Sequence, residues 1–413
     1  MVLVYSPMAA PQQGLYSPIK ERPFFFKQGI NMQINTRRVW MGAMSAVVLA
    51  GLVACGGSSG PTPITKVYVM GDSLADVGTF GLKFTVQDAS SSKGFPIWTQ
   101  IVASNVGLDG AAQCSFYSLT PGSTVPTLSP KCTNFAIGGG RIVVSAADGG
   151  TASPLTVGTQ LKTRAQQGNY TPNDLLLIDG GGNDAADLIG AYLGAAAGAQ
   201  GVANYQAFLA QQLEPAAIAS LLPQPNGAAL AAGAYMQKLA DTFYADIKAQ
   251  ALDKGADRVA VLNMPDVSLT PRFSAVLKGV SAQAGPAASA QLQGAIQQWI
   301  GAFNQQLKTR IANDKRIVVV DFFGEFTQQV AKPASFGLSN ATDAVCPVTG
   351  TDSSGLPSYN FPLCTSAALD ALPGKTANWW SKYLFSDGFH PTPFAHTLLA
   401  QTVTRGLDQA GWR

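Results

Sequence analysis

The sequence predicts an α/β fold, a three-layer sandwich in which helices cover both faces of a central parallel sheet. Four short runs are continuously apolar rather than alternating, which is typical of strands buried on both faces: residues 66–70, 174–179, 258–263 and 316–321. Longer stretches between and after them have apolar side chains at three- and four-residue steps and predict helices. Strands that alternate with helices indicate a parallel sheet, and ligands bind such a sheet beyond the carboxyl ends of its strands.

The elements follow one another in order. The first strand ends at Gly71, the second runs into the glycines after Asp179, and the third stops at Met264-Pro265. The expected helices cover residues 96–106, 231–254, 288–314 and 393–410.

One connection is unusually long. Residues 184–234 are rich in Ala and Gly, and they predict a helical insertion or a cap over the site.

The first 54 residues have the composition of a signal segment. Arg37-Arg38 precedes an apolar run over residues 39–54, which is short for a bilayer span. Residues 1–31 fit no part of a signal, so they come from an upstream start codon or form an extended basic region.

Leu52-Val53-Ala54-Cys55 resembles the lipobox of bacterial lipoproteins, which implies cleavage before Cys55 and acylation of that cysteine. The alternative is a plain signal peptide that ends in cysteine. Gly56 follows Cys55, and by resemblance to enteric lipoproteins this favours the outer membrane. We therefore expect a membrane contact through a lipid anchor; otherwise the protein is periplasmic or secreted.

Residues 55–63 are mostly Gly, Ser, Pro and Thr and predict a flexible tether, followed by a single domain over residues 64–413. The tether contains Gly56-Gly57-Ser58-Ser59-Gly60, which matches the G-x-S-x-G motif of some serine enzymes. That motif needs a strand before it and a helix after it, so we interpret Ser58 as linker.

The charge of the chain gives no sign of a nucleic-acid partner. Residues 1–54 carry five basic and one acidic residue, which leaves 22 basic and 23 acidic residues from Cys55 onward. The excess of basic residues therefore belongs to the signal segment, and we expect a monomer that does not bind nucleic acid.

Four cysteines remain after Cys55: Cys114, Cys132, Cys346 and Cys364. An even number in an exported protein suggests disulfides. The members of each neighbouring pair are eighteen residues apart, so Cys114–Cys132 and Cys346–Cys364 are the simplest of three connectivities. A zinc site is the competing interpretation, but there is no C-x-x-C and no histidine near the cysteines.

A nucleophile and a base can be assigned because histidine is scarce. Ser73 follows the first strand by three residues, at the carboxyl edge of the predicted sheet. The chain has only two histidines, and His390 has Asp387 three residues before it, close enough to orient an imidazole. His396 lies among apolar residues of the last helix and is interpreted as packing or surface. Alone, Gly71-Asp72-Ser73-Leu74 could equally be a capped strand-to-helix turn.

Three further segments favour a catalytic role for the Gly71-Asp72-Ser73-Leu74 motif. The chain resembles the GDSL lipase/esterase family, also called SGNH hydrolases, in four blocks that occur in the order of the family. The blocks begin at Met70-Gly71-Asp72-Ser73-Leu74, Asn134-Phe135-Ala136-Ile137-Gly138-Gly139-Gly140, Gly181-Gly182-Asn183-Asp184 and Ser386-Asp387-Gly388-Phe389-His390-Pro391. The resemblance implies an SGNH hydrolase-like, flavodoxin-like fold, and the Ala-rich insertion is similar to larger bacterial lipases and acyltransferases.

The resemblance also implies the role of each residue. Ser73 is the nucleophile, His390 the general base and then acid, and Asp387 the residue that orients it. Gly139, with neighbouring Gly138 as the alternative, and the side chain of Asn183 donate hydrogen bonds to the negative oxygen that acyl transfer creates. Asp72 and Asp76 hold the turn around the serine, although either could bond to the amide of the site.

These residues predict a serine esterase or lipase that hydrolyses carboxylic esters of acyl lipids or similar compounds, without a metal or organic cofactor. A lipid acyltransferase and a polysaccharide deacetylase use the same residues and remain alternatives. A surface lipoprotein that binds a lipid or a partner through an inactive site is the alternative outside enzymes. Acyl-chain length and the natural substrate stay open.

Overall fold

The computed structural model describes residues 62–91, 93–120 and 125–413, and the expectations for the signal segment, Cys55 and most of the tether lie outside them. In this part of the chain, four parallel strands form the central sheet in the order β1-β4-β5-β6. Their bounds are β1 Lys66–Met70, β4 Asp174–Ile178, β5 Val259–Leu262 and β6 Ile317–Val320. The expected strands are therefore confirmed to within a residue or two.

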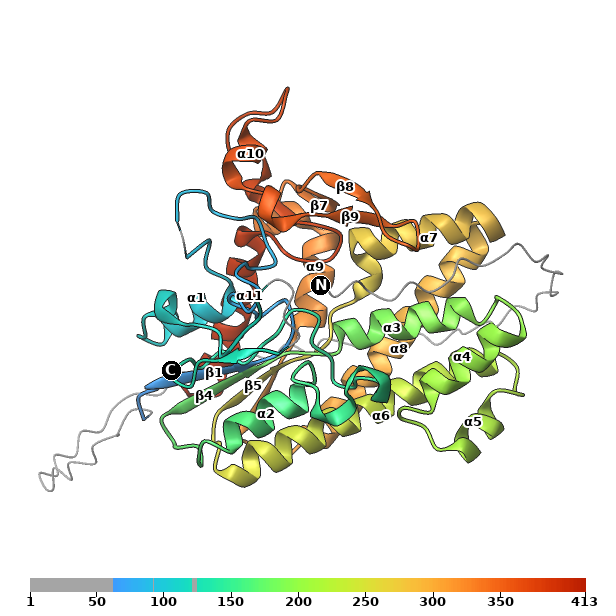
Figure 1. Cartoon of the computed structure of the whole chain (residues 1–413), viewed down its shortest axis with the longest axis horizontal. Helices are drawn as coiled ribbons and strands as arrows, with labels where there is room; N and C mark the ends of the chain where they lie inside the picture. The colour runs from blue at the N-terminus through green and yellow to red at the C-terminus, as the bar shows by residue number, and fades with distance from the viewer. Residues whose placement is uncertain (1–61, 92, 121–124) are drawn as a thin grey trace, which may run out of the picture. The chain divides into compact units, whose positions relative to one another are not determined.

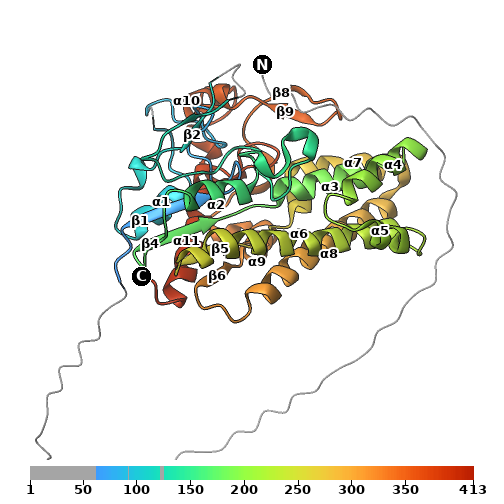
Figure 2. The ribbon, with the colours of Figure 1, turned by 60° about the horizontal axis from the view of Figure 1, so that its bottom comes forward.

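Alternate side chains of each strand enter two different cores. Tyr68 and Met70 of β1 belong to one apolar cluster, whereas Val67 and Val69 belong to the other. The first cluster is closed by α2 (Val157–Ala165), α6 (Gly227–Gln250) and α8 (Pro286–Ile311). The second is closed by α1 (Trp98–Asn105), α9 (Phe322–Ala331) and α11 (Pro393–Gln409). Figures 1 and 2 show the resulting three layers, which confirm the predicted sandwich.

The Ala-rich insertion is helical, as expected. It contains α3 (Gly182–Gly194), α4 (Ala199–Leu209), α5 (Pro215–Leu221) and the first turn of α6. Buried aromatic residues of the insertion, such as Tyr205, extend the core that α6 and α8 share.

The helices α2, α7 (Pro271–Ala284), α9 and α10 (Ser366–Asp370) were not expected from the sequence. α10 is a single short turn. The sequence of α2, VGTQLKTRA, is interrupted by polar residues and lacks a clear apolar stripe.

Each disulfide closes a small hairpin outside the central sheet. Cys114–Cys132 spans the antiparallel pair β2 (Tyr117–Ser118) and β3 (Thr127–Leu128). Cys346–Cys364 spans β8 (Val348–Thr351) and β9 (Pro357–Tyr359). A further parallel pair joins β7 (Asn340–Ala344) to β10 (Tyr383–Phe385), which leads into the Asp387–His390 loop. Both disulfides are the pairs that the sequence suggested.

In the described ranges, no helix combines the length and the apolar character that a membrane span requires.

Candidate active site

The turn after β1 places Ser73 at the carboxyl edge of the sheet. Gly71 forms this turn, and a Cβ there would lie 1.6 Å from Oδ1 of Asp179, the residue that follows β4. A side chain at position 71 would displace the Asp179 carboxyl group, so the close approach depends on glycine. Gln160 of α2 holds the turn from the other side, because its Oε1 accepts the N–H of Gly71 at 2.8 Å and its Nε2 donates to the Gly71 carbonyl at 3.0 Å.

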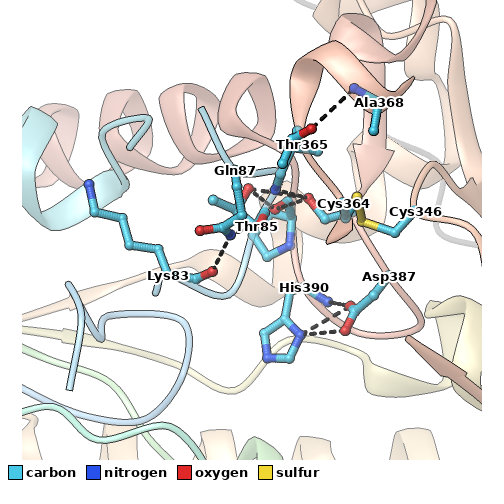
Figure 3. The surroundings of a disulfide bond; sticks show 12 residues. Lys83, Thr85, Gln87, Cys346, Cys364, Thr365, Ala368, Asp387 and His390 are labelled. Atoms are coloured by element: carbon cyan, nitrogen blue, oxygen red, sulfur yellow. Dashed lines mark hydrogen bonds and ion pairs between the residues drawn. A yellow bond between two sulfur atoms is a disulfide. The ribbon is translucent and has the colours of Figure 1, made fainter. Parts of the chain in front are cut away.

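Ser73, His390 and Asp387 form a continuous chain of hydrogen bonds. Nε2 of His390 lies 2.7 Å from Oγ of Ser73, and Nδ1 of His390 lies 2.9 and 3.0 Å from the two carboxylate oxygens of Asp387. Oδ1 of Asp387 also accepts the backbone N–H groups of Phe389 and His390, at 2.8 and 2.6 Å. Figure 3 shows how the short loop folds the carboxylate back onto the imidazole. This geometry allows the imidazole to take the serine proton.

The electrostatics suit a base. Burial alone would lower the pKa of the His390 imidazole, but the charge and hydrogen bond of Asp387 and the charge of Asp72 outweigh it, so the pKa is raised. Burial tends to raise the pKa of Asp387, yet the His390 charge and the hydrogen bonds to its carboxylate keep that pKa below its usual value. Asp387 therefore stays ionised and favours the protonated imidazole.

The second block of the sequence packs directly on the serine turn. A Cβ on Gly140 would lie 2.6 Å from the carbonyl oxygen of Gly71, and Gly139 has a φ of +80°, in the left-handed region that glycine tolerates. Asp76 links the two blocks, because its carboxylate accepts the N–H groups of Gly78, Thr79 and Gly138 at 2.7 to 2.8 Å. The expected structural role of Asp76 is thus visible in its contacts.

The third block reaches the same place from α3. Asn183, the second residue of α3, donates from its side-chain amide to the Gly140 carbonyl at 2.9 Å. Nδ2 of Asn183 carries two hydrogens, so one remains for another acceptor. Gly139 and Asn183 therefore lie on segments that contact each other, next to the turn that carries Ser73.

His396 is not part of this arrangement. Its side chain is 1% exposed, its Nδ1 accepts the backbone N–H of Trp98 at 3.4 Å, and burial lowers its pKa to about 3. Among the two interpretations of His396, packing is the one that its position fits.

Three phenylalanines surround the imidazole of His390. Phe84 stacks on it with ring centroids 5.2 Å apart, and Phe361 and Phe389 approach it edge-on at 5.6 and 5.9 Å. Phe84 also lies where a Cβ on Gly138 would be, 2.2 Å away, so it rests against the second block. Sequence reasoning missed Phe84 because nothing in the loop around it marks it as a neighbour of His390.

An apolar cavity of about 70 Å³ opens beside Ser73 and His390. It extends beyond the carboxyl ends of β1, β4 and β5 towards α9 and α11. Its apolar lining includes Leu74, Leu262, Phe322, Phe326, Phe385, Phe389 and Leu399. Trp379 and Trp380, which precede Phe385 in the chain, are not part of this lining. No residue of the stretch 184–234 is among the residues that line this cavity.

A metal site has no counterpart in the structure: over the described ranges, no three His, Cys, Asp or Glu side chains cluster as ligands would.

Comparison with known proteins identifies the family. The family model for GDSL-like Lipase/Acylhydrolase matches residues 67–403. The chain belongs to this family.

Curated relatives share part of the sequence. A protein of Pseudomonas putida described as uncharacterised, from the trpE-trpG intergenic region, is 27% identical over 355 residues, which are 82% of this chain and 48% of that protein. A GDSL esterase/lipase of Arabidopsis thaliana is 30% identical over 155 residues, 36% of this chain and 37% of that protein. The chain thus spans about half the length, or less, of these relatives.

Two solved structures are similar at low identity. An extracellular lipase from Streptomyces rimosus is 16% identical, with 83% of this chain and 99% of that chain covered and a TM-score of 0.34. A phospholipase A1 from Streptomyces albidoflavus is 14% identical, with 83% and 98% covered and a TM-score of 0.37.

Proposed function

We propose that this protein is a serine esterase that hydrolyses carboxylic esters through an acyl-Ser73 intermediate. The observation that carries the proposal is the hydrogen-bonded chain from Ser73 to His390 to Asp387, with Nε2 of His390 2.7 Å from Oγ of Ser73. Membership of a lipase/acylhydrolase family supports the same reaction class.

In the first half of the reaction, Oγ of Ser73 bonds to the carbonyl carbon of the ester and passes its proton to Nε2 of His390. The carbonyl oxygen becomes negative and accepts hydrogen bonds from the N–H groups of Ser73 and Gly139 and from the Asn183 amide. The tetrahedral intermediate then collapses, the C–O bond to the alcohol breaks, and the protonated His390 gives its proton to the leaving alkoxide.

In the second half, water replaces the alcohol. His390 takes a proton from the water, whose oxygen bonds to the acyl carbon, and the acid leaves as Ser73 regains its proton. Asp387 keeps Nδ1 protonated in both halves, so Nε2 is always the atom that exchanges protons with the substrate.

The cavity beside Ser73 supports an apolar acyl group as the part of the substrate that is held. Its volume of about 70 Å³ is roughly half of the ~150 Å³ that binds benzene in an engineered cavity, so it accommodates only a few carbon atoms. We infer a preference for short acyl chains. In a series of esters from acetyl to decanoyl, kcat/KM should peak at the short end. Phe326→Ala removes a ring from the lining and should move the peak to longer chains.

A lipid acyltransferase and a polysaccharide deacetylase remain alternatives with the same residues. A chain-length series run with and without an alcohol acceptor distinguishes transfer from hydrolysis, because a transferase forms a new ester in preference to the free acid. A binding protein with an inactive site predicts no turnover of any ester.

The decisive test of the mechanism is Ser73→Ala. We expect hydrolysis to fall by orders of magnitude while the thermal unfolding of the protein is unchanged. Because Ser73 is 7% exposed and loses only a hydroxyl group, the variant should fold normally. Near-native activity in a folded Ser73→Ala protein would show that another residue is the nucleophile.

We further propose that the enzyme is exported and anchored as a lipoprotein through Cys55, with the outer membrane as its location. The disulfide bonds of the structure support an oxidising compartment. The lipobox-like Leu52-Val53-Ala54-Cys55 and the tether support the anchor. Mass spectrometry of membrane-extracted protein should find an acylated Cys55 at the N-terminus; an unmodified terminus beyond it indicates a plain periplasmic or secreted enzyme.

A further inference from the structure

A second carboxyl group lies under the serine turn and has no role in the mechanism above. Asp179 follows β4, is 2% exposed, and lies so close to Gly71 that its Oδ1 occupies the place of a Cβ there. Among the residues that the structure describes, neither of its carboxyl oxygens has a hydrogen-bond partner in good geometry. A buried carboxylate without a donor is strongly unfavourable, so this group needs another explanation.

The carboxyl group of Asp72 is the neighbouring acid whose charge and side chain act on Asp179 across the serine turn. Asp72 is the residue before Ser73, and both acids line the cavity beside Ser73 and His390. Two carboxyl groups can hydrogen-bond to each other only when one of them carries a proton, because ionised carboxylates are acceptors only. The pair therefore holds one proton and one negative charge.

The groups around Asp72 and Asp179 determine which of the two acids is charged. Asp72 accepts the backbone N–H of Leu74 at 2.9 Å, and its Oδ2 lies 4.0 Å from where a Cβ on Gly182, the first residue of α3, would be. The positive end of that helix and the N–H group both stabilise an anion. Asp179 has neither. The negative charge belongs on Asp72 and the proton on Asp179.

We propose that Asp179 is a positioning residue of the active site: as a neutral acid it donates a hydrogen bond to Asp72 and so keeps the Asp72 carboxylate charged beside Ser73 and His390. Asp72 then stabilises the protonated imidazole from the side of the serine turn, in addition to Asp387. This inference rests on the proposed role of His390 as the base.

Burial raises the pKa of both acids, and the nearby Asp72 charge raises the pKa of Asp179 further, well above its ordinary value. The other charged groups that act on Asp72 are His390, which is itself paired with Asp387, and Arg141, whose Nε donates to Asp187 of α3 at 2.6 Å. A positive imidazole and Arg141 both favour the charged form of Asp72. The negative charge of the Asp72–Asp179 pair therefore acts on His390, the group that must become positive during catalysis.

The pKa of His390 can be measured directly because histidine is so scarce in this chain. The chain contains two histidines, and the pKa of buried His396 is about 3, so His390 alone titrates between pH 5 and pH 9 in an NMR experiment on tag-free protein labelled at histidine. The measurement needs no substrate, so it stays informative even if the proposed hydrolysis is wrong.

Four proteins are compared: the unmodified chain, Asp72→Asn, Asp179→Leu and Asp179→Asn. Asp72→Asn removes the anion and should lower the pKa of His390 by roughly one unit. Asp179→Leu matches the branched shape of Asp179 but lacks the donor, so Asp72 takes up a proton more readily and the pKa of His390 falls in the same direction. Asp179→Asn keeps an N–H donor in the same shape and should leave the pKa of His390 unchanged.

The acidic limb of kcat/KM should follow the same order, with Asp179→Asn matching the unmodified enzyme. Thermal unfolding is recorded for each variant, since a merely structural role would change stability without moving the pKa of His390. If the pKa is the same in all four proteins, or if Asp179→Asn shifts it as much as Asp179→Leu, the inference is wrong. Loss of activity on Ser73→Ala tests the mechanism separately.

Discussion

Removal of the Cys346–Cys364 disulfide should reduce activity as well as stability. The disulfide is buried, and both cysteines bond to segments of the active site: Cys346 N–H donates to the carbonyl of Ser386, next to Asp387, at 2.8 Å. The Cys364 carbonyl accepts the N–H of Gln87, in the loop that carries Phe84, at 2.8 Å. Figure 3 shows the disulfide, Gln87 and the Asp387–His390 pair together.

The loss of stability can be worked from the loop that the disulfide closes. For a separation of 18 residues, the chain-entropy model gives a stabilisation of about 3 kcal/mol at 25 °C. We expect the double substitution Cys346→Ser with Cys364→Ser to lower the free energy of unfolding by about this amount. The freed segment carries Phe361 and, through Cys346, holds Ser386, the residue before Asp387, so His390 loses support on two sides. A displacement of about 1 Å there is enough to lower kcat tenfold or more.

The other disulfide is a matched control. Cys114–Cys132 has the same sequence separation of 18 residues, so the entropic model gives it the same stabilisation. It closes the hairpin of β2 and β3, and no contact of its cysteines reaches the His390 loop among the described residues. Cys114→Ser with Cys132→Ser should therefore lower stability by a similar amount and leave kcat close to the unmodified value.

The assay is urea unfolding for stability and hydrolysis of a short-chain ester for kcat and KM, below the temperature at which either variant unfolds. Peptide mapping without reducing agent first checks the pairing. Free thiols or crossed pairs such as Cys114–Cys346 would contradict the connectivity. Equal kcat in the two double variants would refute the view that Cys346–Cys364 positions His390.

His390→Ala should be as damaging to kcat as Ser73→Ala, whereas His396→Ala should lower stability and leave kcat nearly intact; an inactive, folded His396→Ala protein would contradict the assignment of the base. Activity requires neutral His390, whose pKa is raised above the ordinary 6.5, so kcat/KM should increase with pH through a midpoint above 6.5, and a flat profile from pH 5 to pH 8 would count against it. Treatment with a chelator should leave kcat unchanged; a loss that one added metal restores would overturn the metal-free mechanism.

The fold was predictable because its main signals are local. A strand buried on both faces of a parallel sheet has to be apolar at every position, so the runs at 66–70 and 174–178 are visible in the sequence alone. The helices α6 and α8 are long enough for their periodicity to be unambiguous. α2 was missed because polar residues interrupt its sequence, VGTQLKTRA, so that no apolar stripe stands out.

The candidate site was predictable to the extent that its residues lie in motifs. Ser73, Asp387 and His390 were assigned from four short blocks, and the structure brings these three side chains into hydrogen-bond contact. Phe84 was not foreseen, because its place beside His390 depends on how the loop between β1 and α1 folds across a loop more than three hundred residues later. Gln160 was missed for the same reason, because its hydrogen bonds to Gly71 depend on how α2 packs against the serine turn.

Asp179 illustrates one limit of what can be predicted from the sequence. Its position was visible, since it directly follows β4 and so lies at the carboxyl edge of the sheet beside Ser73. Its protonation state was not visible, because a sequence does not reveal whether hydrogen-bond donors or another acid surround a carboxyl group. In the structure the carboxyl group occupies the space above Gly71 and meets Asp72. The requirement for glycine at position 71 and the presence of an acid at position 179 are therefore one constraint. An alanine at 71 would force the Asp179 side chain away from Asp72, and the serine turn would lose both its geometry and the proposed hydrogen bond that holds a negative charge beside His390.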